Sequence, residues 1–274
     1  MEYISSRRNP LATHFKKLGS SSAYRRESGE FLCDGRKLLE DAVKSGADVT
    51  AVITASHMQL PLSGGTRVHY ADRGLIESLS PLKNAQDTLF ACRIPLSHVG
   101  FDDTTEKYVD DFSEMTGTHV LLDGVQDPGN VGAIIRTANA FGMKSVILTG
   151  GCADPYNPKT IRASMGAIFR LSVYHMSLSG IAGLRDSGVR FVGAVLREGC
   201  RSIYDVDLSN SVIAVGSEGS GLSEDVLALC SERLTIPIAP ECESLNAAVA
   251  AAVIMWEAAR RTERREERGE RRVE

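Results

Sequence analysis

Three absences narrow the classes of protein to which this 274-residue sequence can belong. Its longest strongly apolar stretch, Ala247 to Trp256, is too short to span a bilayer, and no apolar segment follows Arg7 and Arg8 near the amino terminus. The six cysteines occur singly, without the close pairs that a zinc site or a redox motif requires. We therefore expect an untargeted, soluble, cytoplasmic protein with reduced thiols and no metal.

An excess of positive charge is also missing, because the formal net charge is -4. Neutralising phosphates needs clustered Lys and Arg, so this total argues against a protein coated in nucleic acid. The distribution differs from the total, since Glu2 is the only acidic residue before Glu27. The basic residues of this arm are Arg7, Arg8, Lys16, Lys17, Arg25 and Arg26. A solvated helix face and a contact with RNA both explain such an arm.

The first half of the chain reads as a small α/β unit. Its hydrophobic pattern predicts strands in "FLCD", "VTAVIT" and "DTLFACRIP", and helices in "GRKLLEDAVKSG" and "DRGLIESLS". A polar stretch without sustained periodicity, "SHVGFDDTTEKYVDDFSEMTGT", follows. We place a domain boundary within this stretch.

The second half alternates apolar strands with helices. The strand candidates are "HVLLD", "SVILTG", "FRLSVYH", "RFVGAVL", "SVIAVGSEG" and "RLTIPIA". Near-continuous apolar runs rich in β-branched residues are typical of strands covered on both faces. This half is therefore predicted to form a largely parallel sheet.

A first strand-to-helix junction, from Leu121 to Gly142, contains several polar residues. Asp127 suits the N-cap and Pro128 the first helical position. An apolar stripe follows, formed by Val131, Ile134, Ile135, Ala138 and Phe141. Neither capping nor core packing requires Asn130 or Arg136, so these two side chains are candidates for chemistry.

A second junction, "AVGSEGSGLSEDVL", ends a strand in three glycines, Gly216, Gly219 and Gly221. Glycines allow a ligand to approach the backbone at the carboxyl end of a parallel strand. The stretch lacks the Gly-Lys-Ser/Thr ending of a Walker loop, and its glycines run in the opposite order from the dinucleotide fingerprint. A generic turn does not require a carboxylate here, so Glu218 is a further candidate.

A third junction, "IPIAPECESLNAAVAAAVIMW", joins a strand to a helix rich in small residues. We predict Ser244 as the N-cap of this helix. A tightly packed core helix explains the alanines, but it does not explain Asn246. The charged segment after Trp256 favours an exposed helical tail, with an RNA contact as the alternative.

In order and spacing, these junctions resemble the signature motifs of the SpoU (TrmH) family of RNA ribose 2′-O-methyltransferases, in the SPOUT superfamily. The stretches concerned are "QDPGNVGAIIRTANAFG", "VGSEGSGLS" and "IPIAPECESLNAAVAAAV", with "IRASMGAIFRLSV" as the intervening segment. "ISSRRNP", "RRESGEFLCDGRKLLEDAV" and "SLSPLKNAQDTLFA" resemble, more loosely, the family's ribosomal-protein-like RNA-binding domain. The chain departs from the family at Ala247 and Ala248, where valine and serine are common.

The resemblance implies a domain order, a fold and an assembly. A small α/β RNA substrate-binding domain at 1–105 and a linker at 106–116 would precede a methyltransferase domain at 117–274. The methyltransferase domain would be an α/β fold whose parallel sheet is tied in a deep trefoil knot. A homodimer with its site at the subunit interface is also implied, as is S-adenosylmethionine as the cofactor, bound in the knot.

The resemblance also implies roles for individual residues. The functional side chains of the family correspond here to Asn130, Arg136, Glu218, Ser244 and Asn246. The residues expected around the cofactor are Gly216, Leu222, Ile236, Pro237 and Leu245. With an RNA substrate implied, the basic arm becomes an expected RNA contact.

In the implied reaction a ribose 2′-hydroxyl oxygen attacks the sulfonium methyl, S-adenosylhomocysteine leaves as a neutral thioether, and no metal is needed. Because a guanidinium resists deprotonation, we expect Arg136 to clamp a phosphate and stabilise a developing alkoxide, while the proton leaves to water or only transiently to Arg136. Asn130 and Asn246 would orient the ribose and the arginine, with Ser244 hydrogen-bonded nearby. Glu218 would orient Arg136 or Asn130.

Ribosomal RNA is the expected substrate because of the amino-terminal module, with transfer RNA as the second candidate. Housekeeping and antibiotic-resistance methylation are both compatible with the motifs. The alternative function is that of a catalytically degenerate, RNA-binding ribosome-assembly factor. A dinucleotide-dependent oxidoreductase fails on the glycine order and lacks an acidic residue at the expected place.

Overall fold

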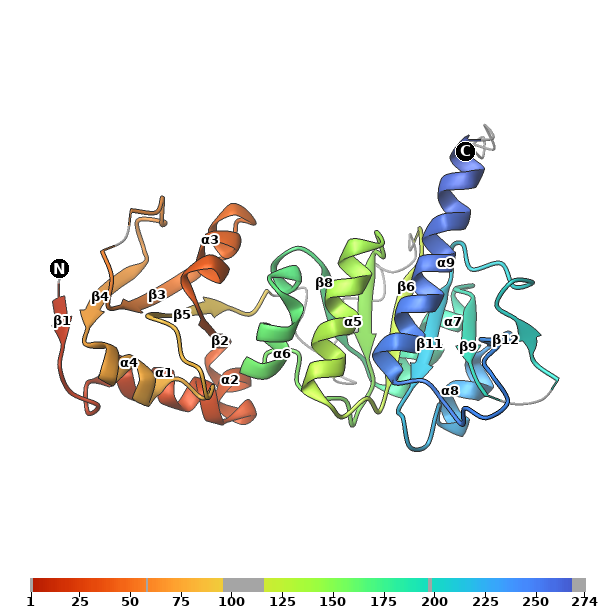
Figure 1. Cartoon of the computed structure of the whole chain (residues 1–274), viewed down its shortest axis with the longest axis horizontal. Coiled ribbons are helices and arrows are strands. Elements are labelled where there is room, and N and C mark those ends of the chain that lie inside the picture. The colour runs from red at the N-terminus through yellow and green to blue at the C-terminus, as the bar shows by residue number, and fades with distance from the viewer. Residues whose placement is uncertain (1, 58, 96–115, 197–198, 268–274) are drawn as a thin grey trace. The chain divides into compact units, whose positions relative to one another are not determined.

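The protein is described by a computed structural model that covers residues 2–57, 59–95, 116–196 and 199–267. Its contacts divide the chain into two compact units (Figure 1). The first unit comprises Met1–Leu96 and Asp154–Arg170, and the second comprises Ser97–Ala153 and Leu171–Glu274. Apart from Thr116, the predicted linker at 106–116 lies outside the described residues.

The described part of the first unit contains a mixed five-stranded sheet. Its strands are β1 (Glu2–Ile4), β2 (Glu30–Asp34), β3 (Val49–Thr54), β4 (Arg67–Ala71) and β5 (Thr88–Arg93). Their spatial order is β1-β4-β3-β5-β2, with β1, β4 and β3 parallel and β5 antiparallel to both neighbours. The three predicted strands are confirmed. Sequence patterning missed β1, which is three residues long, and β4, whose side chains are mostly half-buried.

Helices surround this sheet. They are α1 (Pro10–Ser20), α2 (Ser22–Ser28), α3 (Arg36–Lys44) and α4 (Arg73–Leu79). Helix α1 shows why they form: the Asn9 side chain caps it, and its apolar residues recur on one face. That face buries Leu11, Ala12, Phe15 and Leu18. The opposite face of α1 therefore leaves Lys16 and Lys17 exposed to solvent.

A segment from the second half of the sequence folds with the first unit. It contains helix α6 (Pro158–Ser164) and the 3-10 turn η4 (Ala167–Phe169). The Phe31 ring on β2 packs against Tyr156 at a centroid distance of 4.8 Å and against Phe169 at 6.2 Å. These aromatic contacts explain why the segment belongs to this unit, although the strands that flank it in sequence belong to the other.

The described part of the second unit contains a seven-stranded sheet. Its strands are β6 (His119–Asp123), β7 (Ser145–Leu148), β8 (Ser172–His175), β9 (Phe191–Ala194), β10 (Arg201–Ser202), β11 (Val212–Gly216) and β12 (Glu232–Thr235). Their order is β10-β12-β9-β11-β6-β7-β8, and all neighbouring pairs are parallel. The predicted parallel sheet is therefore confirmed. Strands β6 and β7 are buried along their whole length, as expected for strands covered on both faces.

The order of the strands brings separate parts of the sequence together. Because β6 and β11 are parallel neighbours, the loops that follow them emerge at the same edge. The helices of this unit are α5 (Pro128–Ala140), α7 (Leu178–Asp186), α8 (Glu224–Leu229) and α9 (Ala247–Glu267). Helix α9 packs against α5 and β11. No helix in the described part of the chain is both long and apolar enough to cross a membrane.

Candidate active site

The loop after β6 leads into α5 through the predicted cap. The carboxylate of Asp127 accepts a hydrogen bond from the Asn130 backbone N–H at 2.9 Å, and Pro128 occupies the first turn. This confirms both assignments. The predicted apolar stripe is correct over its first four members, which are fully buried, namely Val131, Ile134, Ile135 and Ala138. It was wrong at Phe141, which lies beyond the helix and is only half-buried.

The glycine loop after β11 requires a glycine at its first position. A Cβ placed on Gly216 would lie 2.0 Å from the carbonyl carbon of Gly221, which no side chain can tolerate. The loop closes on itself because Ser217 and Gly221 exchange two backbone hydrogen bonds at 3.1 and 3.0 Å. Gly221 also has a φ of +68°, a conformation that favours glycine. This tight closure fixes the position of Glu218 in the loop.

Helix α9 is capped by a residue other than the predicted one. The Asn246 side-chain oxygen accepts hydrogen bonds from the backbone N–H groups of Ala248 at 3.0 Å and Val249 at 3.3 Å. The prediction of Ser244 as the cap was wrong, because the helix begins three residues later, at Ala247. Capping of the helix therefore explains the asparagine at position 246, which the sequence pattern did not explain. The amide nitrogen of its side chain takes no part in the cap and can donate to other groups.

Side chains from all three junctions meet in one hydrogen-bonded cluster. Asn130 donates a hydrogen bond to the Glu218 carboxylate through its amide nitrogen. The amide nitrogen of Asn246 lies 3.2 Å from the Asn130 side-chain oxygen and 3.4 Å from the same Glu218 oxygen. We call these three residues the amide–carboxylate cluster. One carboxylate thus orients two amides that are 116 residues apart in the sequence.

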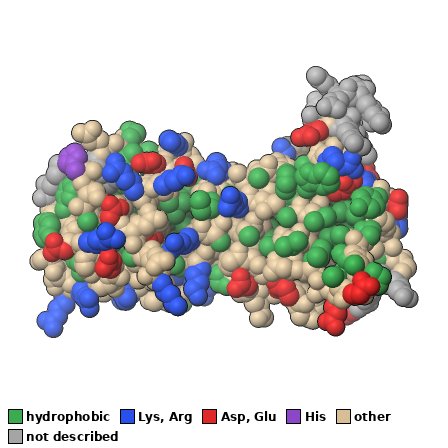
Figure 2. Space-filling view, in the orientation of Figure 1, with side chains coloured by type: hydrophobic (Ala, Val, Ile, Leu, Met, Phe, Trp, Pro, Cys, Tyr) green, Lys and Arg blue, Asp and Glu red, His purple; other side chains and the backbone are tan. Residues whose placement is uncertain are grey.

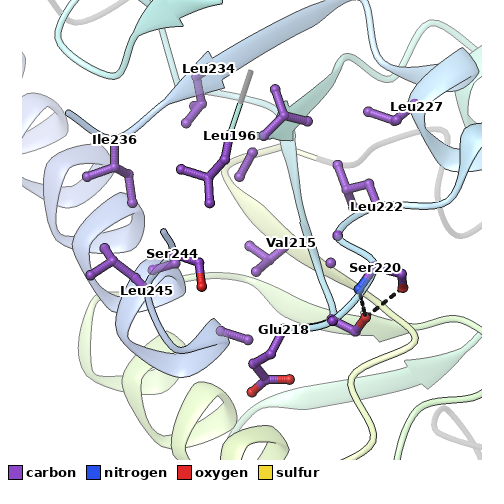
Figure 3. A pocket seen from close by; sticks show the side chains of 18 of the residues that line it. Leu196, Val215, Glu218, Ser220, Leu222, Leu227, Leu234, Ile236, Ser244 and Leu245 are labelled. Atoms are coloured by element: carbon purple, nitrogen blue, oxygen red, sulfur yellow. Dashed lines mark hydrogen bonds between the residues drawn. The ribbon is translucent and has the colours of Figure 1, made fainter. Parts of the chain in front are cut away.

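A cavity of about 290 Å³ opens beside this cluster. Figure 3 shows apolar side chains around it, with the Glu218 carboxylate directed away from them. The labelled apolar residues are Leu196, Val215, Leu222, Leu227, Leu234, Ile236 and Leu245. Of the residues predicted around the cofactor, Gly216, Leu222, Ile236 and Leu245 line the cavity, as does Ser244. Pro237 is exposed and is not part of the lining.

A buried carboxylate that the sequence analysis did not single out supports the same edge of the sheet. Asp123, the last residue of β6, accepts hydrogen bonds from the Thr149 hydroxyl at 2.8 Å and from the Ser223 backbone N–H at 2.7 Å. It therefore ties together the ends of β6 and β7 and the start of α8. The available signal was an acidic residue ending the otherwise apolar strand "HVLLD".

The structure does not bring Arg136 into the amide–carboxylate cluster. Arg136 follows Asn130 by six residues on α5, which corresponds to about 9 Å along the helix axis. Its side chain is exposed, and among the described residues no hydrogen-bond or ion-pair partner holds the guanidinium. An exposed guanidinium that no other side chain holds is available to an anionic partner.

The thiols near the site are poor nucleophiles. Burial raises the pKa of the Cys152 thiol, beside the loop after β6, and raises that of Cys230 to about 11. Both therefore stay protonated at neutral pH, which does not suit covalent catalysis by a thiolate. Within the described ranges, no group of three His, Cys, Asp or Glu side chains is placed to hold a metal ion.

In the first unit, five of the six cations of the predicted basic arm are exposed. These are Arg7, Arg8, Lys16, Lys17 and Arg26. The Lys16 ammonium donates to the Ser78 carbonyl at 3.0 Å, and that of Lys17 lies 5.2 Å from the centre of the Tyr24 ring. Both lysines keep charge at the surface, where a phosphate can reach it.

The structure contradicts the sixth assignment, Arg25. This residue is only 3% exposed, and its guanidinium forms an ion pair with the Asp154 carboxylate at 2.6 Å. It also donates to the Leu18 carbonyl at 2.6 Å. Its hydrogen-bonding capacity is directed inward, so Arg25 attaches the Asp154–Arg170 segment rather than binding RNA. The sequence analysis gave Asp154 no role, because its partner lies 129 residues away.

Comparison with known proteins now identifies the family. Residues 117–256, which contain the three junctions, match the model of the SpoU rRNA Methylase family. A Bacillus subtilis protein, "23S rRNA (guanosine(2553)-2'-O)-methyltransferase RlmP", is 30% identical over 260 residues, which cover 93% of this chain and 98% of that protein. The chain belongs to the SpoU rRNA methylase family.

Solved structures of similar proteins extend the likeness to both units. An AdoMet-bound rRNA methyltransferase from Sinorhizobium meliloti superposes with a TM-score of 0.82 at 26% identity, covering 95% of this chain and 98% of its own. The SpoU methyltransferase AviRb from Streptomyces viridochromogenes, in complex with AdoMet, gives 0.78 at 27% identity, covering 93% and 98%. The family predicted from the three motifs is therefore confirmed, as is its α/β fold with a parallel sheet.

Proposed function

We propose that this SpoU family member transfers a methyl group from S-adenosylmethionine to a ribose 2′-hydroxyl of ribosomal RNA. The observation that carries the proposal is the amide–carboxylate cluster beside the cavity, built from all three family motifs. The name of the Bacillus subtilis relative supports the reaction and the ribosomal substrate. The two AdoMet complexes of similar proteins support the cofactor.

The cavity fits S-adenosylmethionine in size and chemistry. Its volume of about 290 Å³ lies near the lower end of small-molecule sites. The glycine loop exposes backbone N–H and C=O groups for the polar parts of the cofactor. Leu222, Ile236 and Leu245 supply apolar walls for its adenine ring. Pro237, which does not line the cavity, is not assigned a cofactor contact.

When bound, S-adenosylmethionine supplies an electrophilic methyl group on a positively charged sulfur, whose departure as a neutral thioether requires no metal. The residues of the protein have to orient the ribose. Glu218 holds the amides of Asn130 and Asn246 in fixed directions, so that either amide can hydrogen-bond the sugar without first reorganising. Ser244, on the cavity wall, adds a hydroxyl at the same side.

Arg136 acts on the RNA rather than on the cofactor. Its exposed guanidinium can bind a phosphate next to the target ribose through two parallel hydrogen bonds. The same positive charge stabilises the negative charge that develops on the attacking 2′-oxygen. Because a guanidinium resists deprotonation, the hydroxyl proton passes to water.

The protein acts as a homodimer in this proposal. Helix α9 exposes Val249, Val253 and Trp256 to 49, 37 and 51%, and their spacing places them on one face of the helix. Figure 2 shows hydrophobic side chains gathered over α9 on the second unit. A second copy covering this face would bring its own α5 and Arg136 close to the site. Light scattering of Val253→Glu, expected to be monomeric, tests the assembly.

The same proposal includes a deep trefoil knot in the second unit. The close approach of Gly216 and Gly221 and the small side chains on the buried face of α9 suit the tight packing that a threaded chain needs. The first unit then serves as the RNA substrate-binding domain, with Arg7, Arg8, Lys16, Lys17 and Arg26 toward the RNA. The cytoplasm is the compartment in which its ribosomal substrate is available.

Transfer of a labelled methyl group to RNA tests the function. The purified protein is incubated with methyl-labelled S-adenosylmethionine and, in parallel, with ribosomal RNA or transfer RNA. Alkaline hydrolysis then separates the possible products, because a 2′-O-methyl group blocks cleavage at its nucleotide and leaves the label in dinucleotides. Label in dinucleotides from ribosomal RNA is expected. Label in mononucleotides indicates methylation of a base and contradicts the proposal.

Calorimetry with S-adenosylmethionine separates an enzyme from a degenerate RNA-binding protein. We expect saturable binding at one site for each chain. Absence of binding, together with absence of label in either RNA, would show that the chain acts without chemistry. Label in transfer RNA alone would keep the reaction and replace the substrate.

A further inference from the structure

The first unit carries further exposed basic residues beyond the six of the basic arm. Some of them lie on helix α6 and on the loop of residues 80–86, which together form what we call the α6 surface. Its members are Lys83, Asn84, Lys159, Arg162 and Met165, all of which are exposed. We propose that the α6 surface binds the sugar–phosphate backbone of the substrate RNA, an inference that rests on the proposed function.

The two stretches of sequence that form the α6 surface contain basic residues but no acidic residues. No Asp or Glu occurs in residues 78–86 or 155–170, the two stretches that form it. Lys159 and Arg162 are three residues apart on α6, so they lie on the same side of the helix. Arg170 is not included, because its guanidinium and the Asp41 carboxylate both lie near Gly166. The exposed cations Lys83, Lys159 and Arg162 form no ion pair among the described residues and suit phosphates.

The α6 surface is held in place before any ligand binds. The Asp34 carboxylate accepts hydrogen bonds from the Ser80 hydroxyl at 2.6 Å and from the Gln86 backbone N–H at 2.9 Å, which fixes both ends of the loop. Arg162 donates to the Asn84 carbonyl at 3.4 Å and so joins the loop to α6. A pre-organised surface loses less conformational entropy on binding than mobile lysines would.

Met165 adds an apolar group among these charges. It is 51% exposed and has a φ of 48°, in the left-handed region where a helix normally ends with glycine. The backbone thus holds an apolar side chain at the surface, next to the glycine that follows it. Cations beside an exposed apolar side chain match RNA, which offers phosphates next to ribose and base faces.

The α6 surface combines residues from two distant parts of the sequence. Residues 154–170 lie inside the stretch that matches the methyltransferase family, yet they fold with the first unit. Lys83 comes from the amino-terminal half of the chain. RNA on this surface therefore contacts both halves of the sequence within one compact unit. Figure 2 shows Lys and Arg side chains spread widely over the first unit, so the experiment has to separate this surface from other cations.

The test compares two double variants that remove equal charge. Lys83→Ala with Lys159→Ala removes two cations of the α6 surface and leaves Arg162 and its hydrogen bond in place. Lys44→Ala with Arg67→Ala removes two exposed cations of the same unit from other positions. The dissociation constant for deproteinised ribosomal RNA is measured over a series of salt concentrations. S-adenosylmethionine affinity, measured alongside, reports whether each variant is folded.

We expect the α6 double variant to bind RNA about tenfold more weakly, with a slope of log Kd against log salt reduced by about 1.5, because each lost phosphate contact lowers it by about 0.7 to 0.9. KM for RNA rises while kcat stays unchanged. The Lys44 and Arg67 variant keeps the wild-type slope. A wild-type Kd and slope in the α6 variant overturn the inference, even if the wild type methylates RNA. Failure of the wild type to transfer methyl overturns the proposed function instead.

Discussion

The two units use their β-sheets in different ways. In the second unit all strands are parallel, so the loops after β6 and β11 meet at one edge and assemble the amide–carboxylate cluster. The sheet of the first unit is mixed, and its strand ends point to both edges. The exposed cations that we propose to contact RNA lie on α1, α2, α6 and loops instead. A parallel sheet concentrates chemistry at an edge, whereas a mixed sheet leaves binding to the outer surface.

The buried ionic contacts of the two units differ in the same way. In the second unit, Asp123 holds neutral donors at the edge that carries the cluster. In the first unit, the buried pair of Arg25 and Asp154 attaches a distant segment of the chain. Substitutions at these two contacts should therefore disturb the catalytic edge in one unit and the attachment of a segment in the other.

The largest effect is expected at Arg136, on helix α5 of the second unit. Arg136→Ala should lower kcat/KM for methyl transfer by about 10³-fold, or ~4 kcal/mol, because the cation proposed to bind the phosphate and to stabilise the transition state is lost. S-adenosylmethionine affinity should be retained, and calorimetry checks this. Arg185→Ala, which removes an exposed cation from α7 of the same unit, serves as the control. Near-normal turnover of Arg136→Ala would show that the arginine has another role.

In the first unit, Asp154→Ala should destabilise the attachment of the Asp154–Arg170 segment. It leaves Arg25 buried without its partner, which costs about 3 kcal/mol and lowers the Tm of that unit by roughly 10 °C. Differential scanning calorimetry measures the unfolding transition of each unit. Arg26→Ala, at the exposed neighbouring position, should change stability by less than about 0.5 kcal/mol. If Asp154→Ala and Arg26→Ala had the same Tm, the distinction between Arg25 and the rest of the basic arm would be wrong.

Gly216→Ala tests how tightly the catalytic edge is packed. The added Cβ would overlap the Gly221 carbonyl, so the loop has to shift, and S-adenosylmethionine should bind about 10- to 100-fold more weakly. At Gly219, in the same loop, an added Cβ meets nothing within 4 Å. Gly219→Ala should therefore weaken binding much less. Calorimetric titration measures the S-adenosylmethionine affinity of both variants. Equal losses of affinity in Gly216→Ala and Gly219→Ala would contradict the prediction.

The smallest effect is expected at the opposite edge of the same sheet. His119, at the start of β6, lies 2.8 Å from the Ser145 hydroxyl, and burial lowers its pKa from 6.5 to about 4. The unfolded chain binds the proton more readily, so stability is complete above pH 6.5 and falls as the pH approaches 4. Urea unfolding should show a loss on the order of 1 to 2 kcal/mol by pH 5, which His119→Gln reduces.

Cofactor affinity near neutral pH should be unchanged in His119→Gln, because the residue lies at the amino-terminal edge of the sheet. If the stability of His119→Gln fell with decreasing pH as steeply as that of the wild type, another group would be responsible for the decline. A loss of cofactor binding would show that the two edges of the sheet are coupled.

Local sequence patterns were sufficient for much of the fold. The apolar runs predicted the strands of the parallel sheet except β10, which is two residues long, and the Asp127–Pro128 pair predicted the start of α5, because both depend on neighbouring residues. The assignment of Ser244 as the N-cap of α9 also relied on neighbouring residues alone, and it was wrong. Ser244 and Asn246 are both good capping residues, and only the start of α9 decides between them.

The candidate site could be reached from the sequence only in part. Asn130, Glu218 and Asn246 were singled out because no local role explained them, but their hydrogen bonds depend on the order of the strands. Arg25 and Arg26 are adjacent and chemically identical, yet one is buried and the other exposed. That difference depends on Asp154, far along the chain, and no pattern around Arg25 indicates it.

The sequence by itself determined the family, the parallel sheet of the second unit and the residues without a local structural role. These follow from short-range patterns, which periodicity and motif spacing record. Only the tertiary structure decided that residues 154–170 fold with the first unit, that Arg25 is internal, and that two asparagines share one carboxylate. Such contacts join residues about a hundred positions apart, and their energies depend on burial and geometry that exist only once the chain has folded.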